Sequence, residues 1–196
     1  MFKVKKTLLL GMLVFSLVAL LVVGGTMAWF TDEKEVANTF EAGTVKIKLL
    51  ENGSEEAIEK TNVNPGDTFD KEIKVKSVGS KKTYVRVSIT PVWDDEQLET
   101  DNVELIFADG EPGTNWIDGE DGWYYYRYIL EEGEETEELL SQVRIIGDKT
   151  GNEYQGKKLT VNVKSEAVQA SHYAYKDAWV TLPEGVEEWS GEENPE

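Results

Sequence analysis

From Thr44 onward, apolar and polar residues alternate with a period of two, and short turn-rich stretches interrupt the alternation. A β-strand places successive side chains on opposite faces, so this pattern is typical of strands with one buried face. The segments with this alternation or with β-favouring composition are Thr44–Leu50, Lys71–Ser77, Thr83–Val92, Trp123–Leu130, Val143–Ile146 and Lys158–Val168. Because no long amphipathic helix separates them, the sequence predicts an all-β chain of antiparallel strands.

The connections refine this prediction without deciding the topology. Asn64–Asp67 has the turn sequence Asn-Pro-Gly-Asp, in which Pro presets φ and Gly adopts a positive φ without strain. Pro91 marks the end or an edge of its strand. The apolar island Val103–Phe107 fits a brief helix or a strand, and Ala170–Trp179 predicts one or two helical turns. Several short strands with these turns predict a β-sandwich, and the pattern does not decide between an immunoglobulin-like and a jelly-roll topology.

Charge and composition exclude several classes of function. The 196 residues include 20 basic and 38 acidic side chains, a formal charge of −18, whereas nucleic-acid binding requires an excess of Lys and Arg on some face. The absence of Cys removes disulfides, thiol nucleophiles and thiolate metal sites. His172 is the only His, so no two-His zinc motif can form. We therefore predict no nucleic-acid partner, no catalytic residue, no metal ligand and no cofactor.

The first 28 residues have the composition of a secretory signal. Three lysines, at positions 3, 5 and 6, precede the uncharged run Leu8–Val23, and Thr26 and Ala28 supply the small residues of a cleavage site before Trp29. The alternative is an uncleaved anchor helix, because the run approaches the length that spans a bilayer. We prefer cleavage between Ala28 and Trp29, because a signal peptidase requires small residues before the cleaved bond and an anchor helix does not. The cleaved chain has 17 basic and 38 acidic residues, a formal charge of −21.

Three local features have a functional and a structural interpretation. The acidic, Gly-rich loop 109–122 offers oxygen ligands for Ca²⁺, but its spacing does not follow the EF-hand rule, and we favour an ordinary turn-rich loop. Trp123–Tyr126 is either a carbohydrate-stacking platform or a strand whose aromatic side chains alternate between core and outer face; alternation favours the strand. His172 lies in a polar segment and is interpreted as a surface residue.

The segment after the cleavage site is the most informative part of the chain. Two large aromatic residues, Trp29 and Phe30, open the mature N-terminus, which indicates that this terminus docks against something. Gly24–Asp32 and Asn38–Val45 resemble the signal and N-terminus of the TasA/camelysin family of exported fibre proteins. The resemblance continues through Asn64–Asp67, Gly122–Tyr126, Tyr154–Gly156 and Glu166–Ala170.

This resemblance implies a jelly-roll β-sandwich with short helical turns, preceded by an N-terminal signal helix. It implies cleavage between Ala28 and Trp29 by a dedicated signal peptidase of the SipW type. It also implies assembly into extracellular fibres, in which the N-terminal segment of one subunit completes the sheet of the next. Camelysins have been classed as metallopeptidases, but this chain has no His-Glu-x-x-His sequence.

From these observations we expect four regions: a signal peptide 1–28, an N-terminal arm 29–43, a β-sandwich domain 44–183 and an acidic, solvated tail 184–196. The leading hypothesis is a secreted structural subunit of a biofilm matrix or cell surface, not an enzyme. It would form a homopolymer head to tail by donating its arm, and it would contact the membrane only transiently through the signal segment. The expected subunit contacts are Trp29, Phe30, Val36 and Phe40.

Three alternatives to this hypothesis differ in what they require. A secreted metallopeptidase requires bound zinc, and a monomeric module requires a glycan or calcium ligand. A third alternative concerns only the arm, which would fold back as the first strand of its own sandwich.

The signal-peptide interpretation makes a direct prediction about the exported protein. N-terminal sequencing of the protein recovered outside the cell should begin at Trp29, because Thr26 and Ala28 fit a peptidase pocket and the two aromatic residues do not. Recovery of a chain that still begins at Met1 in the membrane fraction would instead support the anchor.

Overall fold

A computed structural model describes residues 31–33, 43–55, 64–110 and 112–191. The strands are β1 (Thr31–Glu33), β2 (Ile47–Glu51), β3 (Thr68–Asp70), β4 (Ile73–Ser77), β5 (Thr83–Trp93), β6 (Val103–Phe107), β7 (Trp116–Asp118), β8 (Tyr124–Tyr126), β9 (Leu140–Ile145) and β10 (Leu159–Gln169). Short 3-10 turns η1 (Gly147–Lys149), η2 (Asn152–Tyr154) and η3 (Ser171–Tyr173) and one α-turn, α2 (Tyr175–Ala178), accompany them. Within these residues, no helix is long and apolar enough to cross a membrane.

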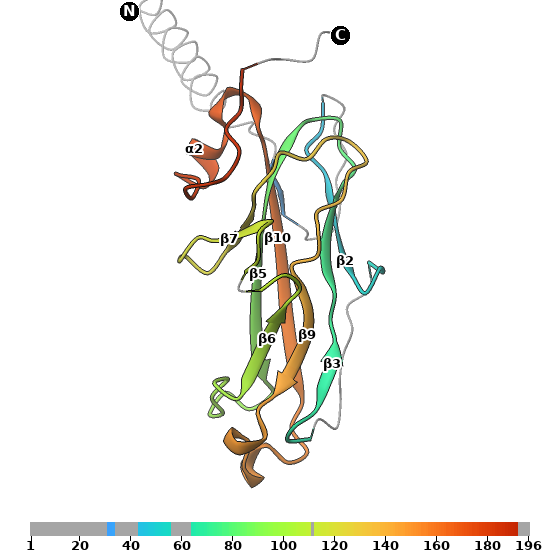
Figure 1. Ribbon diagram of the computed structural model, residues 1–196, viewed down its shortest axis with the longest axis vertical. Helices are drawn as coiled ribbons and strands as arrows, with labels where there is room; N and C mark the ends of the chain where they lie inside the picture. Colours follow the sequence, from blue (N-terminus) through green and yellow to red (C-terminus); the bar gives the residue numbers. More distant parts are fainter. Residues whose placement is uncertain (1–30, 34–42, 56–63, 111, 192–196) are drawn as a thin grey trace, which may run out of the picture.

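The strands form antiparallel sheets around one main core (Figure 1). The largest sheet has the order β1-β10-β5-β8-β7, and two smaller sheets have the orders β2-β4 and β3-β9-β6. Backbone hydrogen bonds from the segment 134–141 to β4, such as Leu139 N to Ile73 O at 2.9 Å, connect the two smaller sheets. The fold therefore has the five-stranded sheet on one side of the core and the two smaller sheets on the other.

The pairing of β5 with β10 runs along the long axis of the molecule (Figure 1). All eleven residues of each strand are in register, from Leu159 opposite Trp93 to Gln169 opposite Thr83. The inner faces of these strands supply Val85, Val87 and Ala167 to the main core. The facing sheets supply residues of β2, β4 and β9: Ile47, Ile73, Val75, Val143 and Ile145.

A second, smaller apolar cluster covers the outer face of the five-stranded sheet at one end. Tyr84, Tyr125 and Val168 contribute from the sheet, and Trp179 and Val186 contribute from the C-terminal segment. This segment is also held by hydrogen bonds to the strands, because the backbone N–H groups of residues 187 and 189 donate to Arg127 O and to the Tyr84 hydroxyl at 2.7 and 2.9 Å. Burial raises the pKa of Tyr84 to about 12, so its hydroxyl stays protonated at neutral pH.

The prediction of an all-β fold with antiparallel strands is confirmed, and the island Val103–Phe107 is a strand. Two short strands, β3 and β7, were not predicted from the alternation. The interpretation of residues from 184 onward as a solvated tail differs from the structure over residues 184–191, because Val186 is buried and Trp189 packs on the second cluster. The signal helix lies outside the described residues.

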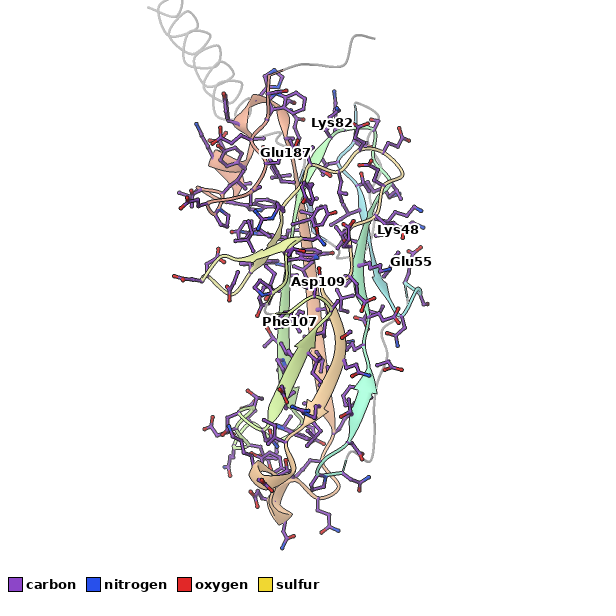
Figure 2. The ribbon with its side chains drawn as sticks, in the orientation of Figure 1. Lys48, Glu55, Lys82, Phe107, Asp109 and Glu187 are labelled. Carbon is purple, nitrogen blue, oxygen red and sulfur yellow. The ribbon has the colours of Figure 1, made fainter. Side chains whose placement is uncertain are left out.

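A buried ion pair joins the end of β2 to the short connection between β3 and β4. Lys71 Nζ lies 2.6 Å from Glu51 Oε2, and the two side chains are 3% and 7% exposed. The Lys48–Glu55 pair, whose lysine is also on β2, is 41% and 47% exposed (Figure 2). Removing one partner of a buried pair leaves a charge in a low-dielectric site, whereas an exposed pair is replaced by water.

These two pairs give a matched test of what stabilises this part of the fold. Lys71→Met should lower the free energy of unfolding by about 3 kcal/mol or more, because the Glu51 carboxylate loses its buried ammonium. Lys48→Met should change it by less than about 1 kcal/mol. Urea unfolding followed by circular dichroism measures both, and equal effects of the two substitutions would contradict the role assigned to the buried pair.

Candidate functional site

The two edges of β10 are covered to very different extents. On one side, β5 pairs with its full length. On the other side, β1 pairs only with Glu166, Ala167 and Val168. Among the described residues, no strand pairs with the outer edge of β10 from residue 159 to residue 165. A strand edge of this kind can pair with an added strand through its backbone N–H and C=O groups.

Two half-buried apolar side chains lie on this stretch of β10. Val161 and Val163 belong to the inner face of β10 and pack against the main core, but both remain half-buried. Leu49 on β2 and Phe69 on β3 are likewise half-buried at the margin of the core. Val161 and Val163 are therefore apolar side chains on the edge strand itself that a further strand could cover.

The other long strand of the sheet is less suited to accept a strand. β8 pairs only with Arg86 and Val87 of β5, so within the described residues the segment 88–93 pairs with β10 alone. This segment contains Pro91, which has no N–H to donate, and proline is one of the devices that protect an edge against strand addition. β10 contains no proline. Of these two edges, that of β10 is the better acceptor.

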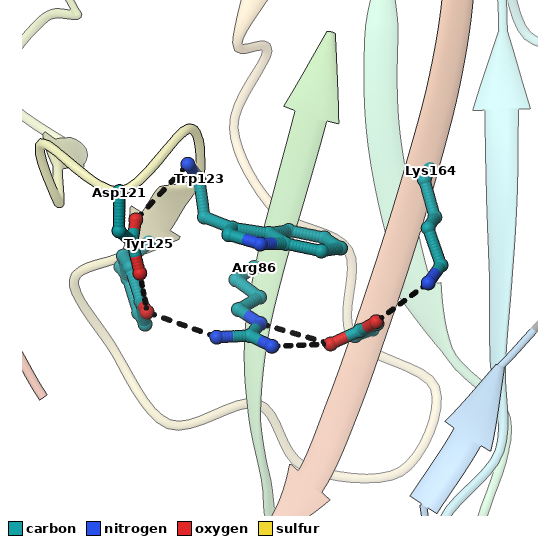
Figure 3. A network of polar contacts seen from close by, with 6 residues as sticks. Arg86, Asp121, Trp123, Tyr125 and Lys164 are labelled. Carbon is teal, nitrogen blue, oxygen red and sulfur yellow. Dashed lines mark hydrogen bonds and ion pairs between the residues drawn. The ribbon is translucent and has the colours of Figure 1, made fainter. Parts of the chain in front are cut away.

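A charged network lies on the outer face of the sheet beside this edge (Figure 3). Arg86 donates from Nε and Nη2 to Glu166 Oε2 at 2.9 and 2.6 Å, and from Nη1 to the Tyr125 hydroxyl at 3.0 Å. That hydroxyl donates to Asp121 Oδ2 at 2.8 Å. On the other side, Lys164 Nζ lies 2.9 Å from Glu166 Oε1. Glu166 therefore has a cation at each of its two oxygens.

The network is shielded by aromatic rings. The guanidinium carbon of Arg86 lies 4.3 Å from the ring centroid of Trp123 and 4.7 Å from that of Trp179. Burial acts to raise the pKa of Glu166, but hydrogen bonds from Lys164 and Arg86 outweigh it and hold the pKa below its usual value. Glu166 is thus a buried but ionised carboxylate at neutral pH.

The aromatic run at β8 packs as alternating strand residues. Tyr124 and Tyr126 contact the main core, and Trp123 and Tyr125 contact the second cluster under the C-terminal segment. All four rings therefore have structural neighbours within the fold, as the strand interpretation requires.

The acidic loop uses its carboxylates to hold its own turns. Asp118 Oδ1 accepts from the backbone N–H of Glu120 at 2.8 Å, and Asp109 Oδ2 accepts from the Thr114 hydroxyl at 2.9 Å. In the part of the chain that the structure describes, no three His, Asp or Glu side chains converge as metal ligands. His172 lies in η3 with a φ of 59°, and its Nδ1 faces the Ser171 hydroxyl at 3.2 Å.

The predicted N-terminal site residues lie outside the described residues: Ala28, Trp29, Phe30, Val36 and Phe40. The short strand β1, from the same arm, pairs with β10 of its own chain, which is the arrangement that the fold-back alternative requires for these three residues. Sequence analysis did not single out Arg86 and Glu166, because they are 80 positions apart and appear only as polar residues on alternating strands. Cross-strand register was the missing signal.

The sequence is similar to one protein family and to one characterised protein. The model of the camelysin metallo-endopeptidase family matches residues 3–109, just over half of the chain. The major biofilm matrix component of Bacillus subtilis (strain 168) is 37% identical over 76 residues, which make up 39% of this chain and 28% of that protein. The match thus spans less than a third of the relative's length. No solved structure matches the chain.

The ionised state of Glu166 gives a pH prediction. A carboxyl with a lowered pKa in the folded state stabilises the fold above its unfolded pKa, near 4.5, and loses this contribution as the pH falls through the folded value. Glu166→Gln should therefore lower the melting temperature at pH 7, and the difference from the parent chain should shrink below pH 4.5.

Glu135→Gln is the matched control, because hydrogen bonding to Lys76 also lowers the pKa of Glu135 but that pair is exposed. Its melting temperature should follow that of the parent chain at every pH. A Glu166→Gln deficit that is equally large at pH 3 and pH 7 would contradict the ionised state of this carboxyl.

Proposed function

The chain belongs to the TasA/camelysin family, and we propose from this that it is a secreted structural subunit of extracellular fibres. It is a protein of the extracellular matrix or cell surface. The name of the B. subtilis relative, a matrix component, supports a structural role over an enzymatic one. The observation that carries the proposal is the stretch 159–165 of β10, with which no other described strand pairs on the outer side and which carries the half-buried Val161 and Val163.

Subunits join by strand addition at this edge. The N-terminal arm, residues 29–43, of one copy lies along β10 of the next, with backbone hydrogen bonds providing strength and alternate side chains filling the apolar margin. In the register of β1, Thr31 lies opposite Val168 and Glu33 opposite Glu166. The same register continued along β10 places Val36 opposite Val163 and Phe40 opposite Leu159. Both apolar arm residues then face the core side of β10.

Chain length supports donation to a second copy over complete fold-back. Glu33 lies opposite Glu166. The backbone of Thr44 is held by hydrogen bonds at the turn 79–81, which lies past the Gln169 end of β10 and so far from Leu159. A strand running from Glu33 to the level of Leu159 and back to that turn needs about 60 Å. The nine residues between Glu33 and Gly43 span at most about 35 Å. The arm therefore cannot cover the far end of its own β10, and in the proposed fibre it leaves its own β10 and pairs with that of the next copy.

Such a contact is heterologous, so it propagates instead of closing. The donor arm begins near one end of its own domain and occupies the opposite end of β10 on the acceptor, which gives a head-to-tail fibre. An added strand completes the sandwich, and we infer that the completed fold is of jelly-roll type. The charge of −21 on the mature chain keeps unassembled subunits apart and makes assembly sensitive to salt.

The residues of this chain do not fit the metal that the metallo-endopeptidase description implies. The whole sequence has one His and no Cys, and the described carboxylates form no three-ligand group. A catalytic zinc needs three protein ligands, commonly with at least two His or with Cys. We therefore propose that this member acts without a catalytic metal or cofactor. Its partners are identical subunits and, during export, the signal peptidase that separates Ala28 from Trp29.

One strand of the acceptor offers a test with an internal control. Val163→Glu puts a carboxylate on the apolar margin where the arm binds, whereas Asn162→Glu puts the same group on the exposed outer face of the same strand. Val163→Glu should raise the concentration of unassembled protein by more than ten-fold, because burial of an apolar anchor contributes about 1.5 kcal/mol or more. Asn162→Glu should change it less than two-fold.

Sedimentation of fibres followed by electron microscopy measures assembly, and thermal unfolding of the monomer shows that each variant keeps its fold. Normal fibres from a folded Val163→Glu variant would refute strand addition at this edge. Equal loss of assembly in both variants would show that added charge, not the site, is responsible.

A further inference from the structure

We propose that Lys164, together with the Arg86–Glu166 pair, selects the strand that binds the edge of β10 by recognising the carboxylate at position 33. In its intermolecular form this inference rests on the proposed function, since the strand then belongs to a second copy. Within one chain it applies to β1 as the structure shows it. Lys164 is in this sense a specificity-determining residue for strand pairing.

The proposal comes from one register row that crosses the whole five-stranded sheet. Glu33 lies opposite Glu166, Glu166 opposite Arg86, Arg86 opposite Tyr125, and Tyr125 opposite Ile117. Directly opposed residues of an antiparallel pair share one face of the sheet, with Cβ atoms about 5 Å apart. The register therefore places position 33, an acidic residue, directly opposite Glu166.

Two acidic residues in opposed positions destabilise a strand pair unless cations balance them. Here the cations are Arg86 and Lys164, which already contact separate oxygens of Glu166. With Glu33 in place, the four residues carry two negative and two positive charges. Without an acidic residue at that position, Arg86, Lys164 and Glu166 carry a net charge of +1, and the Asp121 carboxylate reaches Arg86 indirectly, through the Tyr125 hydroxyl.

The two cations have different surroundings and therefore different roles. Arg86 is 13% exposed, packs against the indole rings of Trp123 and Trp179, and donates two hydrogen bonds to Glu166. Lys164 is 52% exposed and lies two positions along β10 from Glu166. Diagonal neighbours in a sheet are about 7 Å apart, within reach of a long side chain. An ammonium has three N–H donors, so Lys164 can bind Glu166 and an incoming carboxylate together.

A charge-reversal cycle in the full mature chain tests this inference. Lys164→Glu gives the four positions a net charge of −2, Glu33→Lys gives +2, and the double variant restores zero. Each single variant should weaken pairing at the β10 edge about five-fold, and the double variant should return to within about two-fold of the parent chain. Lys176→Glu, on exposed α2, is the control with the same change in charge.

Two readouts keep the inference separate from the proposed function. Hydrogen exchange at the amides of residues 31–33 and 166–168, at concentrations below assembly, reports the pairing of β1 within one chain. The concentration of unassembled protein in equilibrium with fibres reports pairing between chains. Failure of the parent chain to form fibres would overturn the proposed function, while the exchange cycle would still test the role of Lys164.

The result that overturns the inference is additivity. If the double variant shows the sum of the two single effects in hydrogen exchange, position 33 does not interact with Lys164. An effect of Lys176→Glu as large as that of Lys164→Glu would likewise reduce the result to overall charge. Rescue by the double variant, with Lys176→Glu close to the parent chain, would establish the specific pairing.

Discussion

The eleven-residue pairing of β5 with β10 is the interaction on which the rest of this structure depends. These strands lie at the centre of the largest sheet and pair over their whole length, while every other strand in that sheet has three residues. The inner side chains of the two strands pack in the main core. Their outer side chains form part of the charged network and of the second cluster. The packing on both faces of the five-stranded sheet thus depends on this one strand pair.

This length mismatch has a functional consequence. Short strands beside a long one leave part of its edge uncovered, and β10 has only β1 on its outer side among the described residues. The C-terminal segment covers the outer face of the sheet near this edge through Trp179, Val186 and Trp189, and the rings of Trp123 and Trp179 shield Arg86. The described part of the molecule therefore combines a covered outer face with a stretch of β10, residues 159–165, with which no other described strand pairs on the outer side. The proposed strand addition would use both features.

Sequence reasoning found the parts of this fold that local pattern encodes. The alternation in Thr83–Val92 and Lys158–Val168 predicted β5 and β10 closely. β3 and β7 have only three residues each and show too little alternation to recognise. The C-terminal cover was missed because the many Glu residues after position 183 outweighed the two apolar residues, Val186 and Trp189, that pack on the sheet. The pairing of Arg86 with Glu166 depends on register between distant strands, which a single sequence does not show.

The central claim is that the arm of one subunit occupies the β10 edge of another, and disulfide trapping tests it most directly because the natural chain has no Cys. Val36→Cys and Val163→Cys are placed on separate chains, mixed and oxidised during assembly. The account predicts a covalent dimer of the two variants, and little or none when Asn162→Cys, on the opposite face of the strand, replaces Val163→Cys. Fibres that form normally but yield no Val36–Val163 link, or an equal link to position 162, would contradict it.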